Sequence, residues 1–488
     1  MDGASTKPQC EDLQSCQKDL GSYAYYSIDE LQINDVDSLY IVNEGEKLII
    51  KPQLSSTMQN KIDPSDYTFE WFIGIESGTQ GIAPRFFSNT INLDTVLDLS
   101  LGEIEMYLRV TDKKSGIFAL KTFKLAMTNQ GYEGWLVLND DDGNARIDMV
   151  NVYKGNNRVY TDIINEMGGN FAINGRPIAI VTARTNDVYE GFLNYVLTNE
   201  GGYAFNYDNF NSEATYDFKN TLPNTSFNDF SDSRLEAAGP MFEVLHTNGS
   251  VFLKPYAYEF RPAINRVNEQ TFRASPFVAA SDKSYQPICI LFNQDNNAFY
   301  RYPGTGINCF PLLFPEIDTN QKKLLYMTYT KYNGGEVFAV LQDSITQKVF
   351  LARMLLSGQF LSFDEITGES ITKAENFAVS PTFGYLFYSV KGRLYEFDFS
   401  NKKTYKMLDL SDKQITMLKF PKLHLTGLKD QYMQMQYDLA LASHDVKVPR
   451  KSGEFSVYTV PSINRPIQLQ SSFRGFEKVV DVAYKERF

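Results

Sequence analysis

The chain has 488 residues, which is too long for one ordinary hydrophobic core and favours two domains or one domain with a large repeat array. Hydrophobic residues make up 43% and aromatic residues 14% of the chain, so there is enough apolar material for a core, and the many Tyr and Phe residues favour β-strands. The formal net charge of -12 and the scattered Lys and Arg residues argue against nucleic-acid binding, and no apolar run is long enough for a transmembrane helix.

Residues 1–27 form a polar N-terminal tail that contains a cysteine motif. The tetrapeptide Leu13-Gln14-Ser15-Cys16 has the form of a bacterial lipobox, in which the cysteine becomes the acylated first residue of the mature protein. Residues 1–12 contain no apolar h-region, so this segment cannot direct secretion as written. Two interpretations stay open at this point: a signal peptide has been replaced, or LQSC occurs here by chance.

Residues 28–129 have the pattern of a small β-sandwich. Tyr67, Phe69 and Trp71 alternate with polar residues, which places the three aromatic side chains on one face of a strand, with Trp71 in the core. Residues 104–110 alternate apolar with polar, and residues 117–127 predict the return strand. About seven short strands with one Trp in about 100 residues are typical of an immunoglobulin-like sandwich, here without its disulfide.

From residue 130 to residue 488 the chain continues as a series of predicted hairpins. Gly131–Tyr153 predicts the first of them, and Asn248-Gly249 between two apolar runs predicts the plainest two-residue turn. About seven hairpin groups of roughly 50 residues predict a β-propeller, with six or eight blades as alternatives. The strand predicted at residues 479–483 is expected to complete the first blade, which leaves no long exposed sheet edge.

Three segments depart from the hairpin pattern. Residues 162–167 and 233–238 predict single helical turns in connections. Residues 208–239 predict an insertion that is too long for a blade turn. Its aromatic residues favour a packed segment, because disordered segments are normally poor in aromatic side chains.

The cysteines and the acidic turn after the first propeller strand offer little metal chemistry. The four cysteines form no CxxC pair, which argues against a structural zinc site. Cys289 and Cys309 are interpreted as buried free thiols, with a disulfide across neighbouring strands as the alternative. Asp140 and Asp142 are weak candidates for calcium ligands, but Asp-Gly after a strand is first a hairpin turn.

Several segments of the first third of the chain resemble one family. Cys16–Tyr25 is similar to that family's mature start, which is a cysteine, an acidic stretch and the pattern D-x-G-N-Y-x-Y. Further similar segments are Glu44–Glu46, Tyr67–Phe72, Leu108–Gly116, Gly134–Asp142 and Gly175–Ile180. The chain therefore resembles the PKD-like lipoproteins that accompany SusC/SusD-type outer-membrane uptake systems.

The resemblance implies a PKD-like sandwich, a C-terminal β-propeller and a lipid on Cys16 that holds the protein at the extracellular face of the outer membrane. It favours the lipobox interpretation of LQSC. It also implies a SusC/SusD-type transporter pair and companion lipoproteins as partners. The ligand implied is an oligopeptide or an oligosaccharide nutrient, and the transporter itself is a docking partner.

Catalytic motifs are missing from the sequence. It contains no HExxH, P-loop or GxSxG pattern, and His246, His424 and His444 are interpreted as ordinary strand and loop residues. A glycosidase needs two carboxylates about 5 to 10 Å apart, and no pair stands out among the 59 acidic residues. We therefore expect a binding protein without a cofactor. A propeller-type glycoside hydrolase or lyase and a structural or adhesive module are the alternatives.

The candidate ligand-binding residues are aromatic. Flat aromatic faces at one end of a propeller can stack on sugar rings or peptide side chains. The residues concerned are Tyr203, Phe205, Tyr207, Tyr216 and Phe218. The alternative is that these rings fill the blades and fix the insertion.

Overall fold

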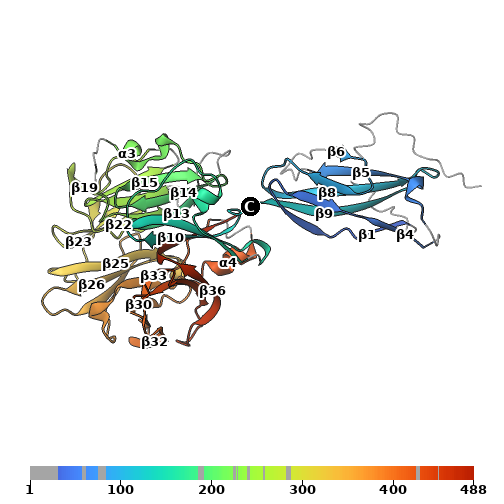
Figure 1. Cartoon of the computed structure of the whole chain (residues 1–488). Helices are drawn as coiled ribbons and strands as arrows, with labels where there is room; N and C mark the ends of the chain where they lie inside the picture. The colour runs from blue at the N-terminus through green and yellow to red at the C-terminus, as the bar shows by residue number, and fades with distance from the viewer. Residues whose placement is uncertain are drawn as a thin grey trace, which may run out of the picture. The chain divides into compact units, whose positions relative to one another are not determined.

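A computed structural model divides the chain into two compact units, Met1–Gln130 and Gly131–Phe488. Both units consist mainly of β-strands (Figure 1). The structure describes residues 31–57, 62–74, 84–155, 157–184, 192–223, 227, 229–238, 242–255, 259–281, 287–424, 429–448 and 450–487. The lipobox-like segment with Cys16 therefore lies outside the described residues. No helix within the described ranges is long and apolar enough to cross a membrane.

The described part of the first unit is a β-sandwich with one five-stranded sheet and two strand pairs. The larger sheet has the order β2 (Leu39–Asn43), β9 (Phe118–Thr128), β8 (Gly102–Asp112), β5 (Tyr67–Gly74) and β6 (Arg85–Ser88). The pairs are β1 (Leu31–Asn34) with β4 (Gln53–Ser56) and β3 (Lys47–Ile50) with β7 (Leu93–Val96). β2 runs parallel to β9, whereas the other pairs are antiparallel.

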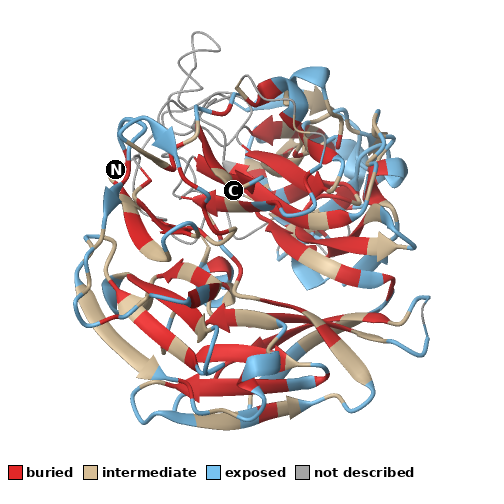
Figure 2. Ribbon diagram, turned by 90° about the vertical axis from the view of Figure 1, so that its left-hand side faces the viewer, coloured by how far each residue is buried: buried red, intermediate tan, exposed pale blue. Residues whose placement is uncertain are grey.

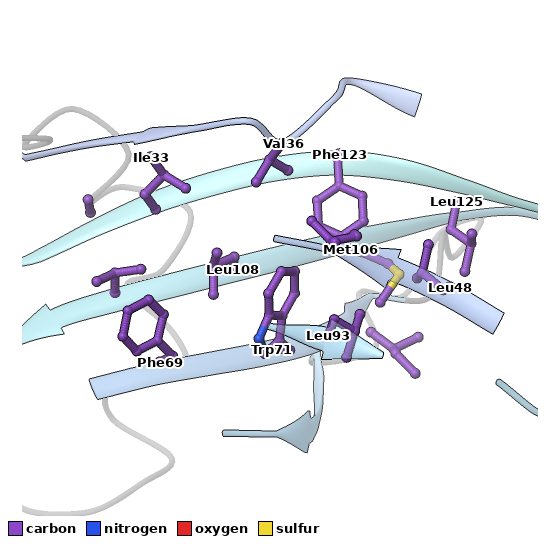
Figure 3. Packing of buried hydrophobic residues seen from close by; sticks show 14 of the residues in the cluster. Ile33, Val36, Leu48, Phe69, Trp71, Leu93, Met106, Leu108, Phe123 and Leu125 are labelled. Carbon is purple, nitrogen blue, oxygen red and sulfur yellow. The ribbon is translucent and has the colours of Figure 1, made fainter. Parts of the chain in front are cut away.

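The sandwich core is built around Trp71, as the alternating pattern predicts. Tyr67, Phe69 and Trp71 are all buried, and the intervening Thr68 is exposed. The indole Nε1 of Trp71 donates a hydrogen bond to the Thr90 carbonyl oxygen at 2.7 Å, so the buried ring keeps its one polar atom satisfied. Figure 3 shows apolar side chains from both layers around this ring.

The second unit is a β-propeller in which the described residues form seven blades. Its first blade has the order β37 (Lys478–Lys485), β10 (Gly134–Asp141), β11 (Asn144–Asn151) and β12 (Arg158–Tyr160). Blade two is β13 (Pro177–Arg184), β14 (Phe192–Thr198) and β15 (Gly201–Asn206), and blade three is β16 (Arg234–Ala238), β17 (Phe242–Thr247) and β18 (Ser250–Pro255). Blade four is β21 (Ala279–Ala280), β22 (Cys289–Asn293), β23 (Ala298–Tyr302) and β24 (Phe310–Pro311).

The remaining blades each have four strands. Blade five is β25 (Lys322–Thr330), β26 (Glu336–Asp343), β27 (Val349–Met354) and β28 (Phe360–Glu365). Blade six is β29 (Asn376–Val379), β30 (Leu386–Val390), β31 (Arg393–Asp398) and β32 (Lys403–Asp409). Blade seven is β33 (Lys413–Lys419), β34 (Leu439–Asp445), β35 (Gly453–Thr459) and β36 (Gln468–Phe476).

Short helices and one extra hairpin lie in the connections. The α-helices are α2 (Ile163–Glu166), α3 (Phe218–Thr221) and α4 (Asp430–Met435), and β19 (Arg266–Val267) pairs with β20 (Gln270–Thr271). Buried residues follow the blade strands and exposed residues gather in the turns (Figure 2). Each strand therefore packs against neighbouring blades, because one blade alone cannot cover its own faces.

The ring is closed by the last strand of the chain. β37 pairs antiparallel with β10 and takes the innermost position of blade one. This confirms that the C-terminal strand completes the first blade. The hairpin of residues 131–153 is confirmed as β10 and β11, whose turn has φ of 55° at Asp142 and 86° at Gly143. Asn248 and Gly249 also have positive φ, as the predicted two-residue turn requires.

The prediction of a helical turn at residues 233–238 is wrong. These residues form β16, the innermost strand of blade three, paired with β17 from Arg234 to Ala238. Leu, Glu and Ala favour a helix locally, but pairing with β17 and burial of Leu235 and Ala237 outweigh that preference. The predicted insertion of residues 208–239 consequently ends in a blade strand.

The described residues in the rest of that segment are packed, and both described cysteines are free. Phe210, Phe218 and Phe230 are almost fully buried, as their aromatic character predicts for a packed segment.

Cys289 and Cys309 are buried free thiols, which confirms the first of the two interpretations. Burial raises the pKa of the Cys309 thiol to about 12, so this sulfur stays protonated at neutral pH.

Candidate functional site

A cavity of about 810 Å³ runs along the axis of the propeller. All seven blades line it, each through its innermost strand or the residues next to that strand. The lining segments are 178–182, 231–237, 276–277, 325–331, 375–379, 416–424 and 480–484. We call this cavity the axial channel.

Described residues between β33 and β34 line one end of the axial channel. The Lys422 Nζ of this connection donates to Glu236 Oε2 at 2.9 Å and to the Ala237 carbonyl at 3.2 Å, so it reaches from blade seven to blade three. On the opposite side, Gln436 accepts a hydrogen bond from Lys331 Nζ of blade five at 3.0 Å. We call residues 420–424 and 429–438 the cap, because they join the carboxyl ends of inner strands on both sides of the channel.

His424 belongs to the cap and its imidazole is engaged in protein contacts. Its ring Nε2 lies 3.0 Å from the Thr182 carbonyl oxygen of blade two, and its backbone N–H donates to Glu486 Oε2 at 2.7 Å. The ring also packs on Phe192 with 5.9 Å between centroids. These contacts orient the cap and leave the imidazole in a structural role.

Two ion pairs neutralise much of the charge inside the axial channel. Lys419 Nζ lies 2.8 Å from Asp481 Oδ1, and the second oxygen of Asp481 accepts the backbone N–H of Ile180 at 2.9 Å. The second pair is the one between Lys422 and Glu236. Because these carboxylates are already bound by lysines, neither is a free acid or base.

Arg234, the first residue of β16, is a cation of the channel wall that forms no ion pair of this kind with a described carboxylate. Within the described ranges, its guanidinium has no hydrogen-bond acceptor and no carboxylate at ion-pair distance. The group stacks on the Phe277 ring at 4.1 Å and is exposed to the channel. Enclosure by the blades lowers the pKa of Arg234, an effect that the charges of Glu236 and Asp481 oppose.

An arc of aromatic rings continues from Arg234 along the channel wall. Phe277 packs edge-on against Tyr326 at 5.5 Å, and Tyr326 stacks on Phe377 at 5.7 Å between centroids. The three rings come from blades four, five and six, and each is half-buried. We call Phe277, Tyr326 and Phe377 the aromatic arc, which offers apolar ring surface beside an open guanidinium.

The far side of the aromatic arc carries a carboxylate. Glu375 immediately precedes β29, is exposed to the channel, and is two residues before Phe377. Its Oε2 accepts a long hydrogen bond of 3.4 Å from Gln414 Nε2, and no described cation lies at ion-pair distance. The wall therefore presents a cation at one end of the arc and an anion at the other.

The aromatic residues predicted to bind ligand lie elsewhere, in packing positions. Phe205 and Phe218 are fully buried and Tyr207 is buried, whereas Tyr203 and Tyr216 are half-buried. They belong to three separate hydrophobic clusters, and none of these five residues lines the axial channel. The Tyr207 hydroxyl donates to the Glu486 carbonyl at 2.6 Å. Ligand binding by these rings stays a prediction.

The acidic turn has a structural role in the first propeller hairpin. Asp140 Oδ1 accepts the backbone N–H of Gly143 at 2.8 Å, and Asp142 holds a positive-φ turn position. Asp141 pairs with Arg146 and with Arg450. Across the described ranges, no three His, Cys, Asp or Glu side chains are arranged to hold a metal ion. Asp140 and Asp142 stay weak metal candidates.

The sequence interpretation missed Arg234 because it assigned residues 233–238 to a helical turn. A usable signal was present, since Arg234 and Glu236 alternate with Leu235 and Ala237 at the period of two that is typical of a strand. The aromatic arc had no such signal. Its rings come from three consecutive blades, and only the packing of these blades against one another brings the rings together.

Comparison with known proteins gives one family match. Residues 16–177 match the model of the PKD-like family, from the cysteine of LQSC through the sandwich to the first residue of β13. A search of the curated proteins found no match.

Among solved structures, the chain is similar to a quinonprotein alcohol dehydrogenase-like protein from Bacteroides thetaiotaomicron, with 11% identity and a TM-score of 0.43 over 94% of this chain and 100% of that one. It is also similar to the Dos1 propeller, with 10% identity and a TM-score of 0.37 over 62% of this chain and 86% of that one. A third similar structure is YCF48 bound to D1 peptide, with 12% identity and a TM-score of 0.37 over 63% of this chain and 89% of that one. These likenesses carry no information on function.

Proposed function

We propose that this protein is a binding protein that is not an enzyme and takes an oligopeptide or oligosaccharide into the axial channel of its propeller. The observation that carries the proposal is the combination of a cavity of about 810 Å³, a guanidinium that no described residue pairs with, and an apolar ring surface within it. Concave sites that combine an apolar surface with a few convergent polar groups are the usual form of ligand pockets.

The chemistry of the lining supports binding over proton transfer. A guanidinium stays protonated in proteins, so Arg234 can hold a ligand but cannot act as a general base. Asp481 and Glu236 are bound to lysines, and the His424 ring is bound to the Thr182 carbonyl.

Filling the axial channel tests this proposal. Thr328 of β25 is half-buried and faces the channel, so Thr328→Trp places a large ring in the ligand's space. We expect the variant to lose binding of oligopeptides and oligosaccharides in isothermal titration calorimetry while its circular dichroism is unchanged. Thr346→Trp, in an exposed turn of the same blade, is the matched control. Undiminished binding by the Thr328 variant would place the ligand outside the channel.

We further propose that the protein is a lipoprotein at the extracellular face of the outer membrane and an accessory of a SusC/SusD-type transporter pair. The support is the match of residues 16–177 to the PKD-like family, which begins at Cys16, together with the LQSC tetrapeptide. In this role the propeller binds the nutrient and passes it to the transporter, and companion lipoproteins are further partners.

Two measurements test the location and the partners. Cys16→Ser should abolish incorporation of labelled palmitate and release the protein from the membrane fraction, because the thiol is the acyl acceptor. Purification of the membrane-bound wild-type protein in mild detergent should retain a transporter pair. Unchanged labelling of the Cys16 variant would refute the anchor, and recovery of the protein alone would refute the partnership.

A further inference from the structure

The guanidinium of Arg234 has hydrogen-bond donors that no described residue of the protein binds. It carries five N–H donors in a planar fork, and within the described ranges none of them has an acceptor. The side chain is exposed to the channel, so these donors are open to an acceptor that enters it. Since Arg234 opens onto the axial channel, the partner that fits is a ligand in that channel.

The position of Arg234 favours one kind of acceptor. Carboxylates accept two parallel N–H bonds from a guanidinium, which is stronger than a neutral hydrogen bond and fixes orientation. Stacking on Phe277 holds the plane of the fork, so the donors are directed before the ligand arrives. A neutral hydroxyl would use only part of this geometry.

We propose that Arg234 is the receptor for a free carboxylate at one end of a short oligomer, whose body lies along the aromatic arc. The inference rests on the proposed function of the axial channel and names the chemistry of its ligand. The separations of 4.1, 5.5 and 5.7 Å from Arg234 to Phe377 correspond to about four or five extended residues at about 3.3 Å each.

Both a peptide and an acidic sugar carry such a carboxylate, and Glu375 favours the peptide. A free peptide has a carboxylate at one end and an ammonium at the other. Arg234 and Glu375 at the two ends of the aromatic arc match this pair of charges. An oligouronate has no cation for Glu375 to bind.

Isothermal titration calorimetry with matched probes tests whether Arg234 binds a free carboxylate of the ligand. The probes are tetra-alanine as the free acid and as the C-terminal amide, and tetragalacturonate and its methyl ester. The proteins are the full chain, Arg234→Gln, Arg234→Lys, and Arg158→Gln as the control. Arg158 also stacks on a tyrosine, at 4.9 Å from Tyr160, but it lies on the outermost strand of blade one.

We expect a probe with a free carboxylate to bind the full chain at least about tenfold more tightly than its amide or ester. Arg234→Gln should abolish this difference, Arg234→Lys should retain part of it, and Arg158→Gln should leave it unchanged. A difference in the peptide pair identifies a peptide C-terminus, and a difference in the sugar pair alone identifies a uronate.

The outcomes separate this inference from the function on which it rests. If the acids and their amide or ester bind the full chain equally, or if the difference survives in Arg234→Gln, the carboxylate receptor is wrong and the binding function stands. If none of the four probes binds the full chain, both are wrong. For a peptide, Glu375→Gln should weaken tetra-alanine but not its N-acetylated form, and an equal loss for both would remove Glu375 from the site.

Discussion

At the scale of single residues, Glu396 of β31 is an unusual carboxyl group. Its side chain is fully buried, its Oε1 accepts a hydrogen bond from Asn464 Nδ2 at 2.9 Å, and its Oε2 has no partner. Burial raises its pKa to about 7, and the nearby charge of Asp398 acts in the same direction. The folded propeller therefore binds a proton here at pH values where an unfolded chain has released it.

This group should make the propeller less stable as the pH rises. Between about pH 4.5 and pH 7 the folded state holds the proton and the unfolded state does not, so the free energy of unfolding falls across this window and levels off above it. We expect Glu396→Gln to remove about 2 kcal/mol of the fall between pH 5 and pH 8. Urea unfolding followed by the fluorescence of Trp135 measures it.

The control for this prediction is Glu365→Gln. Glu365 lies in an ion pair with Lys348 in which both side chains are substantially exposed, so Glu365→Gln should change stability little and keeps the fall that the buried Glu396 causes. Asp438 also has a raised pKa, about 6, and it contributes to the remaining slope in both proteins. An identical pH dependence in wild type and Glu396→Gln would contradict the prediction.

At the scale of elements, the closing strand β37 is held by a buried network around Glu133. Glu133 Oε1 accepts hydrogen bonds from Tyr432 at 2.9 Å, Tyr484 at 3.0 Å and Gln431 at 2.8 Å. Tyr484 belongs to β37 and Tyr432 to α4 of the cap. One carboxylate thus connects the start of the propeller to its last strand and to the cap.

Removal of this carboxylate should destabilise ring closure. Glu133→Ala leaves the buried Tyr484 hydroxyl without its acceptor, and we expect a loss of about 3 kcal/mol from the free energy of unfolding of the propeller. Glu365→Ala, which breaks an exposed ion pair, should cost less than about 1 kcal/mol. Equal losses in the two variants would show that the network does not hold the ring closed.

Some elements of this fold could be predicted from the sequence, and others could not. Turn chemistry at Asp142-Gly143 and Asn248-Gly249 is local, and both hairpins could be predicted from it. β16 was missed because Leu235, Glu236 and Ala237 favour a helix, and only the partner strand decides otherwise. The site could not be predicted at all, since Arg234 meets Phe277 only after blades three and four pack together.

At the scale of the whole molecule, each unit contains one of the two tryptophans of the chain. Trp71 lies in the hydrophobic cluster of the sandwich, and Trp135 of β10 packs on Phe455 and Tyr484 in the propeller. Because the two clusters share no residue, the two units should unfold with separate cores.

We expect Trp71→Ala to destabilise the sandwich alone. The variant leaves a large cavity in that core and should cost about 3 to 5 kcal/mol there. The remaining fluorophore, Trp135, should report an unfolding transition like that of the wild-type propeller, and ligand binding in the axial channel should be unchanged. A shift of the Trp135 transition by a similar amount would show that the two units unfold together.

The cap has a consequence for the size of molecule that this propeller can hold. Lys422 and Gln436 of the cap bind blades three and five at one end of the axial channel, so under the proposed function we expect an oligomer to enter from the other end, terminus first. Binding then depends on the end group of the oligomer and not on its internal repeats. Under the proposed function, the affinity for an oligomer should rise with its length until the aromatic arc is filled and should then stay constant.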